Sequence, residues 1–564
     1  MKLFFRHTFK IFFRGMTCIF LLFLMFSCTS IQEGGGQTYV PLNYSESDVI
    51  ENELNNINLL KEDECVKALW RLENLLLKTD SAYVKKIKEE CKIREEQIFN
   101  LCQKAILENK YYDALSYYDT LCAFDYEKIN ELKINGREIS ERLINSTPGF
   151  NDDYKKFAGE KKVSQFIRGT VTVFVDKGIK IEHGVGRADA VLGSGFFISK
   201  NGYVITNHHV ISDMVDPKYE GFSRLYIRLA DDPDTRIPAK VIGYDSILDL
   251  ALLKAEVEAP YVFKLGTSQG LDVGDKVYAI GSPLGLEKTL TSGIVSSIDR
   301  KLLTLGNVFQ IDAAVNSGNS GGPLIDQDGS VQAVVFAGVQ NYQGLNFAIP
   351  VEYLKLILPS LFNGGQTEHC WIASYGKTKK SSGIPSINEG LEVQYVMPGG
   401  SACLSGIKAG DVITAIDDVE IKNLEAFQTC LMVKKTDSVC RIKILNKDGI
   451  TETKLVYLEK RPQNPGYEIY NHDVIALSFL PITGMELTPL STSSKRKYSV
   501  AKVLKGSIAD ETGFSEHDPV DLLKVEFNEE KTAMYVQLYT KKRKNGFMDM
   551  SIGFAAPLDS PYYY

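Results

Sequence analysis

The sequence predicts a multidomain fold in which an all-α N-terminal region is followed by an all-β domain and two further β-rich blocks. A chain of 564 residues is too long for one hydrophobic core, and this length favours about three to five domains. Apolar residues recur at helical spacing between residues 46 and 147. From about residue 160, short β-rich runs alternate with Gly, Asn and Asp turns, which indicates β-structure.

The first 27 residues have the composition of a secretory signal peptide. Four basic residues precede an apolar stretch that runs from residue 15 to residue 27. This stretch is shorter than the roughly 20 residues that a membrane-spanning helix needs. Cys28 follows a small residue, which resembles a bacterial lipoprotein cleavage site, so we expect Cys28 to be lipidated. An uncleaved anchor or an ordinary signal peptide is the alternative, and each of them places the body of the protein outside the cytoplasm.

A tether and a helical region follow the signal peptide. Residues 28–45 contain the polar, Gly-rich run "TSIQEGGGQT", which is typical of a flexible linker. Residues 46–150 contain "CVKALWRLENLLLK" and "YYDALSYYDTLCAF", and both carry apolar residues at helical spacing. The two segments share an Ala-Leu step, at Ala68 and Ala114, and a later Leu. This pattern is compatible with tetratricopeptide-like repeats and with a plain helical bundle.

The β part divides at two turn-rich linkers, Asn363-Gly364-Gly365 and "KRPQNPG". We expect the all-β domain over residues 155–363, a second block over residues 367–461 and a third over residues 466–560. Runs such as "TVTVFV", "SGFFIS", "GYVIT" and "KVYAIG" are typical of a barrel or a sandwich.

Composition argues against several classes of ligand. The net charge is −7 and no basic stripe is present, so we expect no nucleic-acid partner. Ten cysteines occur, but no CxxC pair or Cys/His cluster does, so we expect neither a metal nor a cofactor. Export permits disulfides, although no pairing follows from the sequence.

Three short stretches carry the residue types of nucleophilic catalysis: "TNHHVI", "DSILDLALLK" and "NSGNSGGPL". A serine hydroxyl needs a base to take its proton, and histidine is suited to that role at neutral pH. A carboxylate must hold the tautomer of the histidine. Glycines around Ser320 permit a sharp turn, so we expect the N–H groups of Gly318 and Ser320 to form an oxyanion hole.

In these stretches the chain resembles the trypsin-fold serine proteases of the HtrA/Deg family. The segments "GSGFFISKNGYVITNHHVI", "GYDSILDLALLK", "AIGSPLGLEKTLTSGIVSSIDR", "DAAVNSGNSGGPL" and "GLNFAIP" occur in the order of that family, within roughly residues 160 to 460. The resemblance implies a trypsin-like double β-barrel protease domain that works through an acyl-enzyme. It also implies a homotrimer or a larger assembly.

The register of the resemblance assigns the catalytic roles. The family pattern Thr-x-x-His-Val places the base at His209 and leaves His208 in a variable position. Asp249 matches the Asp-Leu-Ala of the family, whereas Asp245 is expected to be a turn residue. With Ser320 these residues give a His-Asp-Ser triad. A metal site at the histidine pair is disfavoured, because neighbouring residues of a strand point to opposite faces.

The resemblance also locates an S1 pocket, on the strand after the nucleophile and on the segment before "FAIP". No acidic residue occurs there, so we expect a small or medium aliphatic side chain at P1. The expected pocket residues are Val335, Phe336, Ala337, Gly338, Leu345, Asn346 and Phe347.

Residues 367–461, with "GLEVQYVMPGGSACLSGIKAGDVITAIDDVEI", resemble a PDZ domain. Such domains bind a peptide C-terminus as an added strand, here with a carboxylate loop at Trp371, Ile372, Ala373 and Ser374. Family members usually have Gly at the position of Ala373, and a PDZ fold that binds nothing is the alternative. Residues 466–560 resemble a degenerate, α+β second PDZ domain. For the final Tyr562-Tyr563-Tyr564 we favour a frayed end over a PDZ ligand.

The resemblance therefore predicts a serine endopeptidase of the bacterial cell envelope, in the periplasm or at the outer membrane. Unfolded or mislocalised extracytoplasmic polypeptides would be its substrates, and a lipid anchor would attach it to the membrane. Two alternatives stay open: a PDZ-based chaperone or scaffold with minor proteolysis, and a signalling protease with few substrates.

Overall fold

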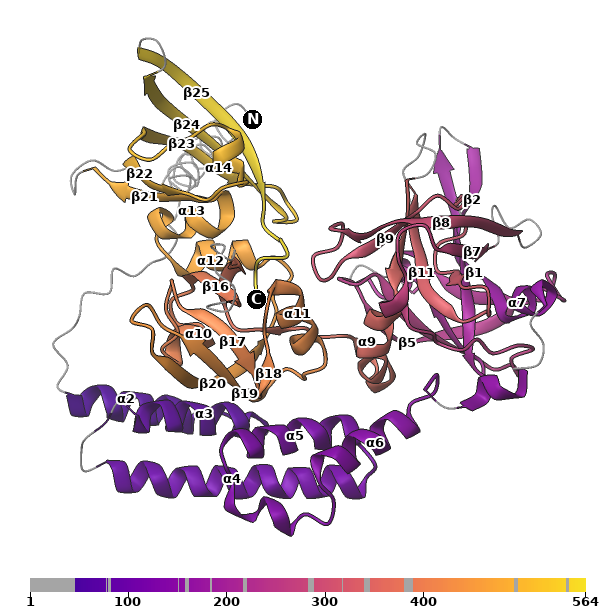
Figure 1. The fold of residues 1–564 in the computed structure, drawn as a ribbon, viewed down its shortest axis with the longest axis horizontal. Helices are drawn as coiled ribbons and strands as arrows, with labels where there is room; N and C mark the ends of the chain where they lie inside the picture. Colours follow the sequence, from indigo (N-terminus) through magenta and orange to yellow (C-terminus); the bar gives the residue numbers. More distant parts are fainter. Residues whose placement is uncertain are drawn as a thin grey trace, which may run out of the picture. The chain divides into compact units, whose positions relative to one another are not determined.

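The computed structural model describes most of the chain from residue 46 onward (Figure 1). The described residues are 46–77, 79, 83–150, 152–157, 162–182, 185–216, 221–281, 289–316, 318–338, 345–379, 389–490, 496–543 and 547–564. The expected signal peptide, the tether and Cys28 lie outside these ranges. The described residues form two compact units, one of residues 46–396, 400–461 and 560–564 and the other of residues 397–399 and 462–559.

The N-terminal region is helical, as predicted. Successive helices pack against one another and bury apolar side chains such as Leu69, Ile98 and Leu121. Ala68 and Ala114, the shared positions of the two apolar segments, are both buried. The helices are α2 (Glu46–Asn58), α3 (Cys65–Leu76), α4 (Val84–Leu107), α5 (Tyr111–Ala123) and α6 (Gly136–Ser146).

Two β-barrels follow, which confirms the predicted double-barrel architecture. The first has the strand order β5-β4-β1-β2-β3-β6, and pairing of β5 with β6 closes it. Its interior holds the alternate residues Val171, Val173 and Val175 of β1, together with apolar partners from the facing strands. Its strands are β1 (Thr170–Glu182), β2 (Val185–Ser199), β3 (Tyr203–Thr206), β4 (Arg224–Arg228), β5 (Ile237–Asp245) and β6 (Leu250–Ala255).

The second barrel is closed in the order β10-β11-β12-β9-β8-β7. Val277, Ile311, Leu324 and Val335 fill its interior. A separate apolar cluster joins residues of both barrels to the helix α9 (Val351–Asn363). The strands are β7 (Lys276–Gly281), β8 (Thr289–Arg300), β9 (Val308–Ile311), β10 (Pro323–Ile325), β11 (Val331–Gly338) and β12 (Asn346–Pro350).

The linker after α9 is part of the first barrel's sheet. Its strand β13 (Gly365–Gln366) pairs in parallel with β5, and the Thr367 N–H donates to the Tyr244 carbonyl over 2.7 Å. The chain then enters a sheet of order β14-β20-β19-β17-β16-β15, in which β15 is an edge strand. The helix α11 (Leu424–Met432) belongs to this domain. Its strands are β14 (Cys370–Trp371), β15 (Ser374–Thr378), β16 (Leu391–Val396), β17 (Val412–Ile416), β19 (Ser438–Leu445) and β20 (Thr451–Lys460).

The helical region packs against strands β19 and β20 of this domain. The Trp70 indole N–H donates to the Leu455 carbonyl over 2.9 Å, and its ring stacks on Tyr457 with centroids 5.4 Å apart. Two ion pairs accompany this contact, between Lys434 and Asp119 and between Lys435 and Asp113. The helices therefore pack at the end of the sheet remote from β15.

The second unit is an α+β domain with a five-stranded sheet. Its order is β21-β22-β23-β24-β25, and its core includes Phe479, Leu487, Leu522 and Leu538. The elements are α12 (Pro465–His472), α13 (Ile475–Thr483), β21 (Met485–Pro489), β22 (Lys497–Val503), α14 (Ile508–Glu511), β23 (Pro519–Phe527), β24 (Ala533–Arg543) and β25 (Phe547–Pro557).

Cysteine and hydropathy add two observations. The eight cysteines of the described ranges are free thiols. Among the helices that the structure describes, none has the length and the apolar character needed to span a bilayer.

Candidate active site

Strand pairing in the first barrel brings His209 and Asp249 together. His209 lies in the short helix α8 (His208–Ile211), which begins just after β3, and Asp249 lies in the turn before β6. β3 and β6 pair so that Thr206 lies opposite Ala251. Residues about 40 positions apart in the sequence thus emerge at the same end of the sheet.

The Asp249 carboxylate binds His209 through both of its oxygens. Oδ2 lies 2.7 Å from the imidazole Nδ1, and Oδ1 accepts the backbone N–H of His209 over 2.8 Å. The Asp249 side chain is 14% exposed and that of His209 is 47% exposed. A carboxylate at Nδ1 selects the tautomer that leaves Nε2 as the proton acceptor. The pair therefore has the geometry of an oriented general base.

Asp249 has a left-handed backbone, with φ at 53°. This conformation is uncommon for residues other than glycine and is seen most often at turns and functional sites. The buried Asn207 holds it, since its Nδ2 donates to the Asp249 carbonyl over 2.8 Å. Asn207 directly precedes the histidine pair, so one local segment positions both the base and the carboxylate.

Asp245 is the last residue of β5 rather than a turn residue, contrary to the expectation, although its side chain binds the turn that follows. Its Oδ1 accepts the N–H groups of Ile247 and Leu248 over 3.0 and 2.9 Å. Its Oδ2 lies 2.8 Å from Nε2 of His369, and both side chains are buried. His369 follows β13, 124 residues further along the chain, and no local pattern pointed to it. The turn that carries Asp249 is therefore tied to the entry of the next domain.

His208 packs against the barrel wall. Its ring stacks on Tyr244 with centroids 5.2 Å apart and an interplanar angle of 17°. Burial lowers the pKa of His208, so its neutral form is favoured. In the described part of the chain, no cluster of three potential metal ligands includes it. The two adjacent histidines thus have different environments, and His209 is the one that pairs with Asp249.

The loop of Ser320 is held by Ser194 of β2. The Ser194 N–H donates to the Ser320 carbonyl over 2.7 Å, and its Oγ donates to the Gly318 carbonyl over 2.6 Å. The Ser320 hydroxyl donates to the Phe336 carbonyl over 3.3 Å. Within the described residues, the Gly318 and Ser320 N–H groups donate to no other part of the chain.

Gly321 shows why this loop needs glycine. Its φ is 85°, and a Cβ there would overlap the Ser194 carbonyl oxygen and the Thr206 Oγ1. The overlapped atoms belong to the backbone and to a buried, hydrogen-bonded side chain, so they could move aside only at a large cost in stability. The close approach of the loop to β2 and β3 thus depends on the absence of a side chain.

The expected S1 residues lie on the paired strands β11 and β12 and just before them. The Phe336 and Phe347 rings have centroids 6.4 Å apart. Val335 instead packs in the barrel interior, so its contribution to this region is its carbonyl, which accepts the Gly321 N–H over 2.8 Å. Asn346 is buried and donates to the Ala313 carbonyl over 2.8 Å. Leu345 is half-buried, and the side chain of Ala337 lies outside the described ones.

The expected carboxylate loop, Trp371 to Ser374, runs from the last residue of β14 to the first residue of β15 and is buried. Ala373 has φ at 61°, which is the left-handed conformation that glycine adopts most readily. The loop therefore has the backbone conformation that suits glycine, although alanine occupies this position. The final tyrosines are not frayed, contrary to the expectation, because Tyr563 and Tyr564 are buried and pair with β15.

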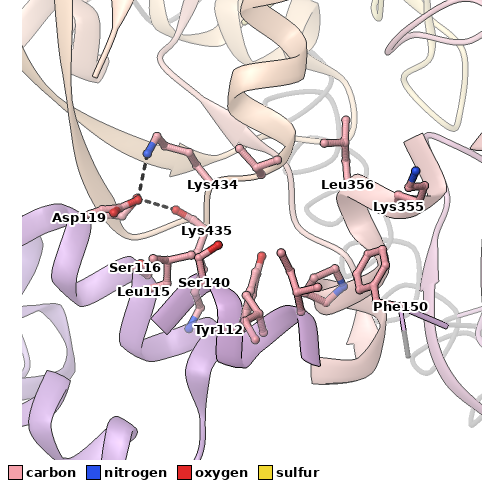
Figure 2. Close-up of a pocket in the computed structure, with 15 residues that line it drawn as sticks. Tyr112, Leu115, Ser116, Asp119, Ser140, Phe150, Lys355, Leu356, Lys434 and Lys435 are labelled. Carbon is pink, nitrogen blue, oxygen red and sulfur yellow. Dashed lines mark hydrogen bonds and ion pairs between the residues drawn. The ribbon is translucent and has the colours of Figure 1, made fainter. Parts of the chain in front are cut away.

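A pocket elsewhere shares no residue with this site. Figure 2 shows it beside α5, α6 and α9 and the segment 433–438, and its lining is mostly apolar, with Tyr112, Leu115 and Leu356. None of His209, Asp249 and Ser320 lines it. It is therefore not the site of the chemistry considered above.

Family comparisons match four parts of the chain. Residues 193–334 match a trypsin-like peptidase domain, and residues 392–446 match a PDZ domain. Residues 466–558 match a TP0546 family PDZ domain, and residues 48–143 match a domain of unknown function (DUF8517). The chain thus contains a trypsin-like peptidase domain, two PDZ domains and a helical N-terminal region.

The similar proteins are named as serine endoproteases or HtrA-type proteases. A probable periplasmic serine endoprotease DegP-like of Marinomonas sp. (strain MWYL1) is 34% identical over 49% of this chain and 58% of its own length. One of Chlamydia pneumoniae is 30% identical over 56% of this chain and 63% of its own length. The chain thus spans about three-fifths of these relatives. A solved structure, "HtrA-type protease AlgW with decapeptide", is 26% identical with a TM-score of 0.44, and it covers 54% of this chain and 99% of its own.

Proposed function

We propose that this chain, which is similar to DegP-like serine endoproteases, is a serine endopeptidase with a His209-Asp249-Ser320 triad. The observation that carries the proposal is the two-point binding of His209 by the Asp249 carboxylate, at 2.7 and 2.8 Å. The imidazole that this contact orients is about half exposed rather than buried in the core. A carboxylate bound in this way fixes the tautomer and the orientation of the imidazole, as a general base requires.

In the proposed mechanism, Ser320 Oγ attacks the scissile carbonyl while His209 Nε2 takes its proton. Asp249 stabilises the imidazolium, and the N–H groups of Gly318 and Ser320 bind the oxyanion. His209 then protonates the leaving amine, which gives an acyl-enzyme. Water activated by His209 hydrolyses this ester. Because the Ser320 hydroxyl donates to the Phe336 carbonyl here, this hydrogen bond must break before the hydroxyl can donate to His209.

The setting of this activity is also part of the proposal. We assign residues 1–27 to a signal peptide and Cys28 to a lipid anchor, which places the enzyme in the cell envelope. Unfolded or mislocalised extracytoplasmic polypeptides are the proposed substrates, with aliphatic P1 residues. A homotrimer or a larger assembly is the proposed state. The boundaries 46–150, 155–363, 367–461 and 466–560 are the proposed domains, with peptide binding assigned to the first PDZ domain.

Hydrolysis of a permanently unfolded protein such as reduced casein tests the activity. Ser320→Ala should lower the rate by about 10⁶-fold, because the residual catalysis of a triad without its nucleophile is small. Sequencing of the product ends reads the P1 preference in the same experiment. Ser292→Ala, at an exposed serine of β8, is the control and should cleave at the normal rate. Full activity of Ser320→Ala would show that the triad is wrongly assigned.

A further inference from the structure

The segment of residues 560–564 pairs with the edge strand β15 of the first PDZ domain, with an isolated antiparallel bridge between Tyr563 and Tyr375. The Ser374 N–H donates to the Tyr564 carbonyl oxygen over 2.8 Å, and the Tyr564 N–H donates to the Ser374 carbonyl over 2.9 Å. Two residues further along, the Gly376 N–H donates to the Tyr562 carbonyl over 3.1 Å. Backbone bonds of this alternating kind are those of an antiparallel pair. The segment therefore pairs with the β15 edge of the sheet. The end of the chain lies beside α11 (Figure 1).

The ring of Tyr564 fills an apolar pocket of the same domain. It is 2% exposed, and its centroid lies 4.8 Å from that of Phe427 of α11 in an edge-to-face arrangement. Leu431 of α11 belongs to the same cluster. A Cβ on Gly376 would overlap the Tyr564 hydroxyl, so the absence of a side chain on β15 makes room for the phenol. The pocket thus accepts an aromatic side chain.

The preceding residues of the segment are held by polar contacts. Gln428 of α11 donates its Nε2 proton to the Pro561 carbonyl over 2.8 Å. The Tyr562 ring lies 4.8 Å from the Lys377 ammonium and 5.9 Å from that of Lys301. Lys377 is on β15, and Lys301 follows β8 of the second barrel. The segment therefore contacts both the PDZ domain and the peptidase domain.

We propose that residues 560–564 are the resident ligand of the first PDZ groove, and that this groove selects extended peptides with an aromatic residue at the Tyr564 position. An edge strand beside a helix is where PDZ domains add a peptide, and here the chain's own segment occupies that place. Any external peptide must displace it. The segment is thus an intramolecular competitor, and this inference does not depend on the proteolytic mechanism.

The strength of the competition depends on the covalent connection between the segment and the domain that it binds. A segment of the same chain has an effective concentration in the millimolar range when its connection spans the distance without strain. A free peptide that binds with a Kd of tens of micromolar then meets a groove that is mostly occupied. Its apparent affinity should fall by roughly ten- to a hundredfold relative to an empty groove.

The test measures binding of a fluorescein-labelled Asp-Ser-Pro-Tyr-Tyr-Tyr peptide, the sequence of residues 559–564, by fluorescence anisotropy. All proteins carry Ser320→Ala, so that cleavage cannot affect the readout. The full chain is compared with a chain that lacks residues 560–564 and with Tyr564→Asp, which places a charge in the apolar pocket. Tyr535→Ala, at a tyrosine that is 51% exposed, is the matched control.

The truncated chain and Tyr564→Asp should bind the peptide at least tenfold more tightly than the full chain and Tyr535→Ala. Equal affinity of the full and truncated chains would overturn the proposal, and so would a truncated chain that binds no peptide while its circular dichroism is unchanged. Tyr564→Asp keeps the test decisive if the truncation itself unfolds the domain. A full chain that runs as a tail-exchanged dimer, dissociated by the truncation, would overturn the intramolecular assignment.

Discussion

At the scale of single residues, two adjacent histidines have separate roles because they face different surroundings. Asp249 binds His209 through Nδ1 and the backbone N–H, whereas His208 stacks on Tyr244. The threonine register of the sequence had selected His209. The stacking partner of His208, which is Tyr244 of β5, was visible only in the fold.

His209→Ala should abolish hydrolysis of unfolded casein, since it removes the base that Asp249 orients. His208→Ala should retain most of the activity and lower the melting temperature, because it removes a half-buried ring from its packing against Tyr244. Initial rates and thermal melts of both variants make the comparison. An inactive His208→Ala beside an active His209→Ala would reverse the assignment.

The buried Asp245–His369 pair is another residue-scale feature, and it defines a role for Asp245 beyond its contacts with the turn. A composition or spacing argument cannot reveal it, because the partners are 124 positions apart and each is ordinary in its local sequence. The contact exists because β13 joins the sheet beside β5 and carries His369 to the turn.

At the scale of elements, the nucleophile loop depends on close approach between backbones. Gly321 lies against β2 and β3 at a positive φ, while Ser194 binds the carbonyls of Gly318 and Ser320. The Gly-x-Ser-Gly-Gly spacing predicted a sharp turn. Which strand the turn would press against was decided by the packing of the two barrels.

Gly321→Ala should destabilise the protein by about 2 kcal/mol or more and should lower hydrolysis strongly, because the new methyl group overlaps buried atoms at a strained φ. Gly221→Ala is a matched control, since Gly221 has φ at 82° and no atom lies within 4 Å of the place that its Cβ would take. Gly221→Ala should lower the free energy of unfolding by about 1 kcal/mol, because it introduces the backbone strain without the overlap. The urea midpoint of unfolding and the rate of casein hydrolysis, measured for both variants, separate the effect of the overlap from that of the backbone strain. Equal midpoints for Gly321→Ala and Gly221→Ala would contradict the overlap.

At the scale of the whole chain, the helical region is built into the same compact unit as the peptidase and the first PDZ domain. Trp70 is the centre of the contact, with its indole N–H on the Leu455 carbonyl and its ring on Tyr457. Because the helices pack near β19 and β20, they leave the β15 edge to the segment 560–564.

Trp70→Ala should cost about 3–5 kcal/mol, the usual effect of deleting a buried tryptophan. The loss should separate the unfolding of residues 46–146 from that of the remaining unit, as an earlier calorimetric transition and as faster amide exchange in α3 to α5. Leu59→Ala, at a side chain that is 82% exposed, should leave a single transition. A single unshifted transition for Trp70→Ala would show that the helices do not depend on this contact.

The sequence by itself determined the classes of structure and the identity of the catalytic candidates. Periodicity and turn residues are local properties, so they indicated helices followed by β-rich blocks. The family resemblance implied the double β-barrel and the PDZ domains, and its register indicated His209, Asp249 and Ser320. The tertiary structure decided which distant segments meet: His369 with Asp245, Trp70 with Tyr457, and Tyr564 with the PDZ pocket. The expectation of a frayed end for the last tyrosines was wrong, because burial of an aromatic segment depends on a pocket that distant residues build.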